Sequence, residues 1–238
     1  MSILILLLAA GAATAQTRPA TPVPRYEVRR AASPIIIDGK PDERAWAAAG
    51  KIELIFPWDS QKGAKQKTTA RLLWNDANLY VSYECEDSDI TAKVTERDGP
   101  TYLDDVVELF VNPKPSQEHT YIGLEMNVRA VLYDYLDSAG RYVFRRFNLQ
   151  GVKLATWIDG TLNESGDRDR GWSLEVAIPW ANFEELSKRP EPGTVWKANL
   201  NRWDGTAPAR RLSMWSDPLV ARPNPHVPSR FGELVFVQ

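Results

Sequence analysis

Short segments in which apolar and polar side chains alternate constrain this chain more than any other feature. In residues 79–86, for example, Val81, Tyr83 and Cys85 alternate with polar residues, which is the two-residue period of a half-buried strand. Clusters of Gly, Pro, Asp or Asn separate most of these segments, as expected for turns. The predicted strands cover residues 51–56, 68–74, 79–86, 106–112, 121–128, 131–136, 152–158, 172–178, 195–202 and 233–237.

Only one segment favours a helix, residues 42–49, with Asp42 as its expected N-cap. Strands and helices therefore do not alternate, which argues against a parallel sheet with crossover helices. The sequence predicts an all-β fold, an antiparallel, jelly-roll-like β-sandwich with one short N-terminal helix. Residues 25–238 contain no internal linker, so we expect them to form one domain.

The N-terminal residues are typical of a secreted protein. Residues 3–10 are apolar but too few to span a membrane, and Ala13-Thr14-Ala15 supplies a small-x-small cleavage pattern, although no Lys or Arg precedes the apolar run. We expect residues 1–15 to be a signal peptide cleaved after Ala15, and residues 16–24 to be an extended leader rich in Pro and Thr. The protein is therefore predicted to be secreted or periplasmic.

Charge and cysteine content exclude several classes of function. The net charge of −2 comes from mixed signs with no basic stripe, which argues against a nucleic-acid partner. No other stretch is long and apolar enough for a membrane span. The single cysteine, Cys85, excludes an internal disulfide and a cysteine-based zinc site. Nine Trp, eight Tyr and seven Phe leave enough aromatic side chains for both a core and a ligand platform.

Alternation assigns opposite faces to the side chains of three predicted strands. In residues 106–112, Val107, Leu109 and Val111 suit the core, while Glu108 and Phe110 lie on the other face.

The same reasoning places further polar and aromatic side chains on the outer faces of two other strands. These side chains are Tyr121, Glu125, Asn127, Arg129, Lys197, Asn199, Asn201 and Trp203. Aromatic rings can cover the C–H face of a sugar while carboxylates, amides and Arg bond its hydroxyls, so this face is a candidate sugar site. A solvated sheet face would show the same alternation.

Seven segments in order resemble a known family over most of the chain, from Ile35 to Val237. The segments are residues 37–46, 78–81, 104–111, 171–180, 199–200, 215–218 and 230–232. The chain resembles carbohydrate-binding module family 9 and its family 9-like relatives. The resemblance implies a β-sandwich that holds mono- or oligosaccharides or glycan ends without catalysis, often with structural calcium. Such modules sit beside xylanases, so it also implies carbohydrate catabolism alongside a separate glycan-degrading enzyme.

The resemblance also implies a sugar held between two Trp rings, with a Glu and an Arg on adjacent hydroxyls. The Glu carries over to Glu108, and the first ring falls at Tyr102. The Arg position falls at Glu125. The second ring falls near Pro225-His226, so we expect Trp203 or His226 to supply that wall. The predicted carbohydrate-binding residues are Tyr102, Glu108, Glu125, Asn127, Arg129, Asn201, Trp203 and His226.

Other interpretations of these residues stay open from sequence. Glu108 could instead be a structural carboxylate paired with Arg97 or Arg129. A glycoside hydrolase would need two carboxylates, for which Glu108 and Glu125 are candidates. The site could also be degenerate, leaving a structural or interaction module.

Two metal-dependent alternatives remain. An acidic cluster of Glu84, Glu86, Asp87 and Asp89 offers the oxygen ligands that calcium prefers, without the spacing of an EF-hand. A haem-binding electron-transfer sandwich would need axial ligands, for which Met126, Met214 and His226 are the candidates.

Overall fold

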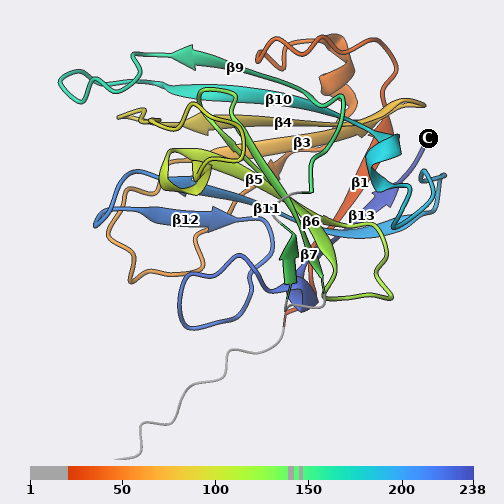
Figure 1. Cartoon of the computed structure of the whole chain (residues 1–238). Coiled ribbons are helices and arrows are strands. Elements are labelled where there is room, and N and C mark those ends of the chain that lie inside the picture. Colours follow the sequence, from red (N-terminus) through yellow and green to blue (C-terminus); the bar gives the residue numbers. More distant parts are fainter. Residues whose placement is uncertain (1–20, 139–141, 145–146) are drawn as a thin grey trace, which may run out of the picture.

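The computed structural model describes residues 21–138, 142–144 and 147–238, and it is an all-β protein whose strands form two layers (Figure 1). The predicted signal peptide and residues 16–20 of the leader lie outside the described residues. The strands are β1 (Arg25–Arg30), β2 (Ile52–Glu53), β3 (Thr68–Trp74), β4 (Asn78–Glu86), β5 (Val106–Asn112), β6 (Tyr121–Asn127), β7 (Leu132–Ser138), β8 (Tyr142–Phe144), β9 (Lys153–Asp159), β10 (Gly171–Pro179), β11 (Val195–Asp204), β12 (Arg211–Met214) and β13 (Gly232–Phe236). The short 3-10 helices are η1 (Arg44–Ala48), η2 (Thr101–Leu103), η3 (Trp180–Phe183) and η4 (Pro228–Arg230).

Hydrogen bonds link the strands in the order β8-β7-β6-β5-β11-β13-β1-β3-β4-β10-β9, with β12 beside β11 and β2 beside β3. Strand β1 joins the two layers, because Arg25–Val28 pairs with β13 while Arg29 and Arg30 pair with β3. Both pairings of β1 are parallel, which corrects the expectation of a purely antiparallel sandwich; the other strand pairings of the described residues are antiparallel. A strand that changes sheets in this way forms a corner of the sandwich.

The apolar faces of the two layers meet in one core, and the alternation within β5 confirms the predicted faces. Val107, Leu109 and Val111 are fully buried in this core, as are the inward side chains of β3, β4, β10 and β11. Trp180 packs edge-on against Trp196 at 5.9 Å between ring centroids, a geometry worth about 0.5–1.5 kcal/mol beyond area burial. The opposite face of β5 is consequently left free to build a site.

The predicted helix over residues 42–49 is shorter and of another type. Five residues form the 3-10 helix η1, after which Ala49 returns to an extended conformation. The indole nitrogen of Trp46 donates to the Glu175 carboxylate on β10 at 2.9 Å, which fixes this segment on the sheet. Asp42 does not cap the helix, since Glu43 is the residue that precedes it.

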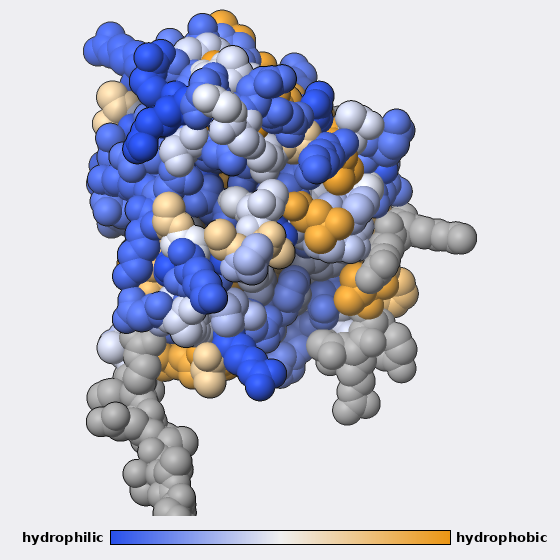
Figure 2. Space-filling model, turned by 90° about the vertical axis from the view of Figure 1, so that its left-hand side faces the viewer, coloured by the Kyte–Doolittle hydropathy of each residue, from blue (hydrophilic) through white to orange (hydrophobic). Residues whose placement is uncertain are grey.

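None of the helices in the described residues is long and apolar enough to cross a membrane. On the face shown in Figure 2, hydrophobic residues form small, separate patches among hydrophilic ones. The described part of this face therefore offers no broad apolar surface.

Candidate functional site

A hollow of about 500 Å³ opens on the outer face of the layer that contains β5, β6, β7 and β11. Its floor consists of outward side chains of these strands, and its walls come from η2, β8, the turn before β12 and the loop before η4. The lining residues are Tyr102, Glu108, Tyr121, Glu125, Tyr133, Tyr135, Asp137, Val143, Trp203, Arg210, Pro223, Asn224, Pro225 and His226. Five of the predicted site residues, Tyr102, Glu108, Glu125, Trp203 and His226, therefore meet in one concavity.

Strand register explains why these side chains meet on the floor. Asn201 on β11 lies opposite Glu108 on β5, Glu108 lies opposite Glu125 on β6, and Glu125 lies opposite Tyr133 on β7. Directly opposite residues of antiparallel strands point to the same face with their Cβ atoms about 4.5–5.5 Å apart. The two glutamates are therefore neighbours, although only 2% of Glu108 and 4% of Glu125 is exposed.

The two carboxyl groups cannot both carry full charge at low cost. Burial, and then the charge of Glu125, raise the pKa of Glu108 well above its usual range. Against this rise, Asn201 Nδ2 donates to Glu108 Oε2 at 3.2 Å, and Arg210 contributes a favourable charge. A protonated carboxyl of this pair can donate a hydrogen bond toward the hollow and an ionised one can accept.

Arg210 supplies the cation of the site, which was predicted at other positions. Its Nη2 donates to the Asp104 backbone carbonyl at 2.8 Å, and its guanidinium lies 5.0 Å from the centroid of the Trp203 ring. Arg210 was missed because it belongs to the turn between β11 and β12 and not to an alternating strand. The Gly205 turn, followed by a short segment that returns beside Trp203, was the available signal.

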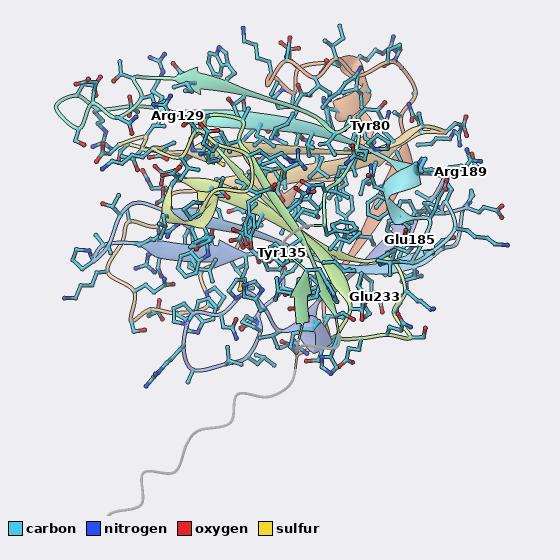
Figure 3. The ribbon with its side chains drawn as sticks, in the orientation of Figure 1. Tyr80, Arg129, Tyr135, Glu185, Arg189 and Glu233 are labelled. Atoms are coloured by element: carbon cyan, nitrogen blue, oxygen red, sulfur yellow. The ribbon has the colours of Figure 1, made fainter. Side chains whose placement is uncertain are left out.

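Aromatic side chains form the walls on both sides of the carboxylates. Tyr102 is 41% exposed and packs against Tyr133 with 6.2 Å between ring centroids. Tyr135, near the centre of Figure 3, lies over Gly123, where an added Cβ would fall 2.3 Å from the tyrosine ring. The missing side chain at Gly123 therefore leaves the space that the Tyr135 ring occupies.

His226 supplies part of the opposite wall. Its ring stacks on Phe110 with 4.9 Å between centroids and an interplanar angle of 19°. Its Nδ1 is 2.8 Å from the hydroxyl of Tyr121, so both the plane and the rotation of the ring are fixed. His226 and Trp203, the two residues predicted to replace the second Trp ring, thus both line the hollow.

The other three predicted residues do not line the hollow, and two are elsewhere. Asn127 is fully buried beneath the loop that connects β4 to β5. There its Nδ2 donates to the Val94 carbonyl and the Asp104 carboxylate, both at 2.9 Å. Arg129 is exposed, donates to the Ala92 carbonyl, and lies well away from Tyr135 in Figure 3. Alternation gave Asn127 the predicted face, but a covering loop takes up its polar groups.

Asn201 lies behind the lining and contacts Glu108 directly. The amide oxygen of Asn201 is buried and has no hydrogen-bond partner among the described residues. The alternative pairings of Glu108 are wrong, because Arg97 pairs with Asp134 at 2.6 Å and Arg129 with a backbone carbonyl. Glu108 is therefore not held by either of the arginines that a structural role required.

The acidic cluster predicted after β4 does not form. The side chains of Glu84, Glu86 and Asp89 are exposed, while Asp87 turns inward and meets Asp105 and Asp204. Inward and outward residues alternate at the end of β4, which separates neighbours in sequence onto different faces.

The three inward carboxylates are of the kind that binds calcium. The carboxylate oxygens of Asp87, Asp105 and Asp204 lie within 4.8 Å of one another. However, Nη2 of the fully buried Arg202 donates to Asp87 at 2.9 Å and to Asp204 at 2.5 Å. The guanidinium already takes up oxygens of two of the three carboxylates that a calcium ion would need, so these residues do not fit a calcium ion.

The candidate haem ligands are not brought together. Met126 lies in the main core and Met214 in a separate apolar cluster with Trp58 and Leu212. His226 is on the outer face and is engaged by Tyr121. The described residues therefore offer no axial pair from these three side chains.

Comparison with known proteins identifies the family of this chain. The sequence profile of the carbohydrate family 9 binding domain-like family matches residues 37–238. The chain is 29% identical over 186 residues to "Exoglucanase XynX" of Acetivibrio thermocellus and 26% identical over 184 residues to "Endo-1,4-beta-xylanase C" of Paenibacillus barcinonensis. These alignments cover 77% and 76% of this chain but only 15% of each relative.

Solved structures share the fold. A candidate carbohydrate-binding protein of Bacteroides uniformis superposes with a TM-score of 0.78 at 20% identity, covering 90% of this chain and all of that one. A family 9 carbohydrate-binding module of Caldicellulosiruptor kristjanssonii in complex with cellotriose gives 0.62 at 18% identity, covering 90% of this chain and 93% of that one. The profile spans most of the described residues, and the chain belongs to the carbohydrate family 9 binding domain-like family.

Proposed function

We propose that the hollow around Glu108 binds a mono- or oligosaccharide, or the end of a glycan, without cleaving it. The observation that carries this proposal is the buried Glu108–Glu125 pair, framed by aromatic rings and faced by Arg210. A sugar presents hydroxyls that donate and accept and a C–H face that packs on rings. Hydrogen bonds to charged groups contribute about 1.5–3 kcal/mol each, enough for two or three of them to orient a sugar.

The position of the two glutamates supports binding without catalysis. Hydrolysis needs carboxyl groups that flank the scissile bond, one as acid and one as base or nucleophile. Glu108 and Glu125 instead rise side by side from adjacent strands of the floor. They would therefore contact the same side of a bound sugar.

The setting of this function is proposed from sequence and relatives. The expected signal peptide over residues 1–15 would place the protein outside the cell or in the periplasm. The curated relatives are named as an exoglucanase and a xylanase, and this chain spans about 15% of their length. A role in carbohydrate catabolism beside a separate glycan-degrading enzyme accounts for both observations.

Calorimetric titration tests the proposal with glucose, cellobiose, cellotriose and xylobiose. In Glu108→Ala we expect at least one of these affinities to fall about ten- to a hundredfold, the equivalent of one charged hydrogen bond. Glu185→Ala is the matched control, because Glu185 is exposed and lies away from Tyr135 in Figure 3.

Two results would contradict the proposal. Equal affinity of the Glu108→Ala and wild-type proteins for the sugar that binds best would remove the hollow as the site. Release of the chromophore from aryl glycosides by the wild type, lost in Glu108→Ala, would identify a hydrolase instead.

A further inference from the structure

A second hollow of about 760 Å³ lies on the outer face of the other layer, formed by β2, β3, β4, β10 and β9. One row of directly opposite residues crosses all five strands of its floor. In order the row is Glu53, Thr69, Glu84, Ser173 and Trp157. All five line the hollow, so carboxylates and hydroxyls alternate toward an aromatic ring at one end.

The shape of this floor differs from that of the first hollow. Adjacent strands are spaced about 4.8 Å apart, so a row across five strands extends about 19 Å. Glu84 and Glu53 keep side-chain exposures of 46% and 65%. The hollow is therefore a long, open strip, which suits a run of linked units better than one enclosed ring.

Residues 38–40, which are fixed to the sheet by hydrogen bonds, form the wall beside the aromatic end of the strip. Trp157 is 41% exposed, and the ammonium of Lys40 lies 5.4 Å from the centroid of its ring. The amide groups of Asp38 and Gly39 donate to the buried carboxylate of Glu175 at 3.3 and 3.1 Å. Gly39 has a φ of +91°, and an added Cβ would fall 2.3 Å from the Thr156 backbone. The segment can approach β9 this closely only with glycine, so the wall beside Trp157 is preformed.

Charge on the strip favours an uncharged ligand. Lys67 pairs with Glu53 at 3.0 Å, and Arg71 pairs with Glu84 at 3.0 Å. Because both signs alternate, the strip has no single field to attract an anionic or cationic polymer. It does offer donors and acceptors at short intervals, which is what chains of hydroxyl groups require.

We infer that this second hollow binds the interior of a neutral, linear glycan chain, while the first hollow takes a single sugar or a chain end. The inference rests on the proposed function and extends it to a second site. The two hollows lie on opposite outer faces of the sandwich, so both can be occupied at once. Trp157 stacks on a sugar ring, and Glu53, Thr69 and Glu84 bond the hydroxyls of the units that follow. The buried Ser173 hydroxyl instead donates to the Gly39 carbonyl and helps to hold the wall beside Trp157. The protein then has two glycan contacts of different kinds.

Affinity gel electrophoresis tests this with hydroxyethylcellulose, glucomannan and arabinoxylan as neutral chains and polygalacturonate as an anionic one. We expect Trp157→Ala to weaken retardation on at least one neutral chain about three- to tenfold, as for loss of one stacking contact. Its affinity for the small sugar bound in the first hollow stays unchanged. Trp157→Phe keeps a ring and restores most of the retardation. Ile36→Ala is the matched control, since Ile36 is 66% exposed and lines neither hollow.

The outcomes separate this inference from the proposed function. Small-sugar binding with equal chain retardation of the Trp157→Ala and wild-type proteins, or with no chain binding by either, overturns the second hollow alone. Retardation by polygalacturonate only, abolished by salt, overturns the neutral ligand. If the wild type binds neither small sugars nor chains, the proposed function fails and this inference fails with it.

Discussion

Two groups of buried carboxylates lie close together in this protein, and their surroundings differ. Asp87, Asp105 and Asp204 enclose the guanidinium of Arg202, which is fully buried. Glu108 lies opposite Asn201, the residue next to Arg202, and it points with Glu125 to the outer face beside a hollow. Both groups are removed from water, but only the first contains its own buried cation.

The difference indicates which group serves the fold and which is left for a ligand. Removing carboxylates from water costs several kcal/mol each unless charges and hydrogen bonds offset it. Arg202 offsets that cost inside the aspartate group, and amide groups of Thr91 and Gly205 donate to Asp105 at 2.7 and 2.6 Å. In the glutamate pair, Asn201 donates to Glu108 and the charge of Arg210 at the rim of the hollow is favourable. Both glutamates line the hollow that an incoming molecule would enter.

The largest expected effect comes from removing the cation of the aspartate group. Arg202→Met leaves two buried carboxylates, Asp87 and Asp204, without their cation, and we expect it to lower the free energy of unfolding by about 3–5 kcal/mol. Urea denaturation measures this change. By contrast, Glu108→Ala should alter the free energy of unfolding by less than about 1 kcal/mol, since the hollow already exists.

Arg170 provides a matched control for Arg202→Met. Arg170 also pairs with an aspartate, Asp159, but its side chain is 80% exposed. Arg170→Met should therefore leave the urea midpoint unchanged. If Glu108→Ala proved as destabilising as Arg202→Met, the distinction between the two carboxylate groups would be lost.

A smaller effect follows from pH. Burial, followed by the charges of Asp87 and Asp204, raises the pKa of Asp105 to about 7. Its unfolded pKa is about 3.9, so between these values the folded state binds more protons than the unfolded state. The resulting contribution to stability is complete below the unfolded pKa and is lost as pH rises through about 7.

Urea denaturation between about pH 5.5 and pH 8.5 should therefore show a falling free energy of unfolding. The pKa of Glu108 is raised in the same direction, so Glu108→Gln should reduce the fall without abolishing it. If Glu108→Gln abolished the fall in the free energy of unfolding, the glutamate pair alone would be its source. Stability that rose with pH in the wild type would contradict both assignments.

The smallest effect concerns the wall of the first hollow. In Gly123→Ala the new methyl group meets the far end of the Tyr135 ring, which can move into the hollow. We expect a few-fold loss of affinity for the bound sugar, because the displaced ring enters the hollow. We also expect a modest fall in thermal stability, because only 3% of Tyr135 is exposed and its ring packs on Tyr133. Calorimetry and a thermal melt measure the two quantities. Unchanged affinity would show that Tyr135 is not part of the sugar contact.

The sequence predicted the faces of long strands well, for a simple physical reason. A two-residue period leaves no choice once three apolar residues alternate, so Glu108 and Phe110 had to lie opposite Val107, Leu109 and Val111. Strand β1 was missed because its six residues contain only two buried apolar side chains, Tyr26 and Val28. Strand β12 was missed because four residues are too few for a period to show.

The site was predicted only in part, because pairing between distant strands decides which outward residues meet. Alternation assigned Asn127 the outer face, but it could not show that the loop containing Val94 and Asp104 covers it. Arg210 was out of reach for the opposite reason, since a turn residue has no period. Its place beside Trp203 depends on how the β11–β12 hairpin closes.

The corner formed by β1 has a consequence for how the chain is made. Tyr26 pairs in register with Leu234, so the first described strand hydrogen-bonds the last. On a ribosome, the seam between the two layers cannot close until residues 232–236 have left the exit tunnel. Contacts this distant in sequence slow folding, and the open edges of β1 and β11, which both pair with β13, stay exposed to neighbouring chains until it emerges. Translation that stops before β13 should therefore leave an aggregation-prone chain.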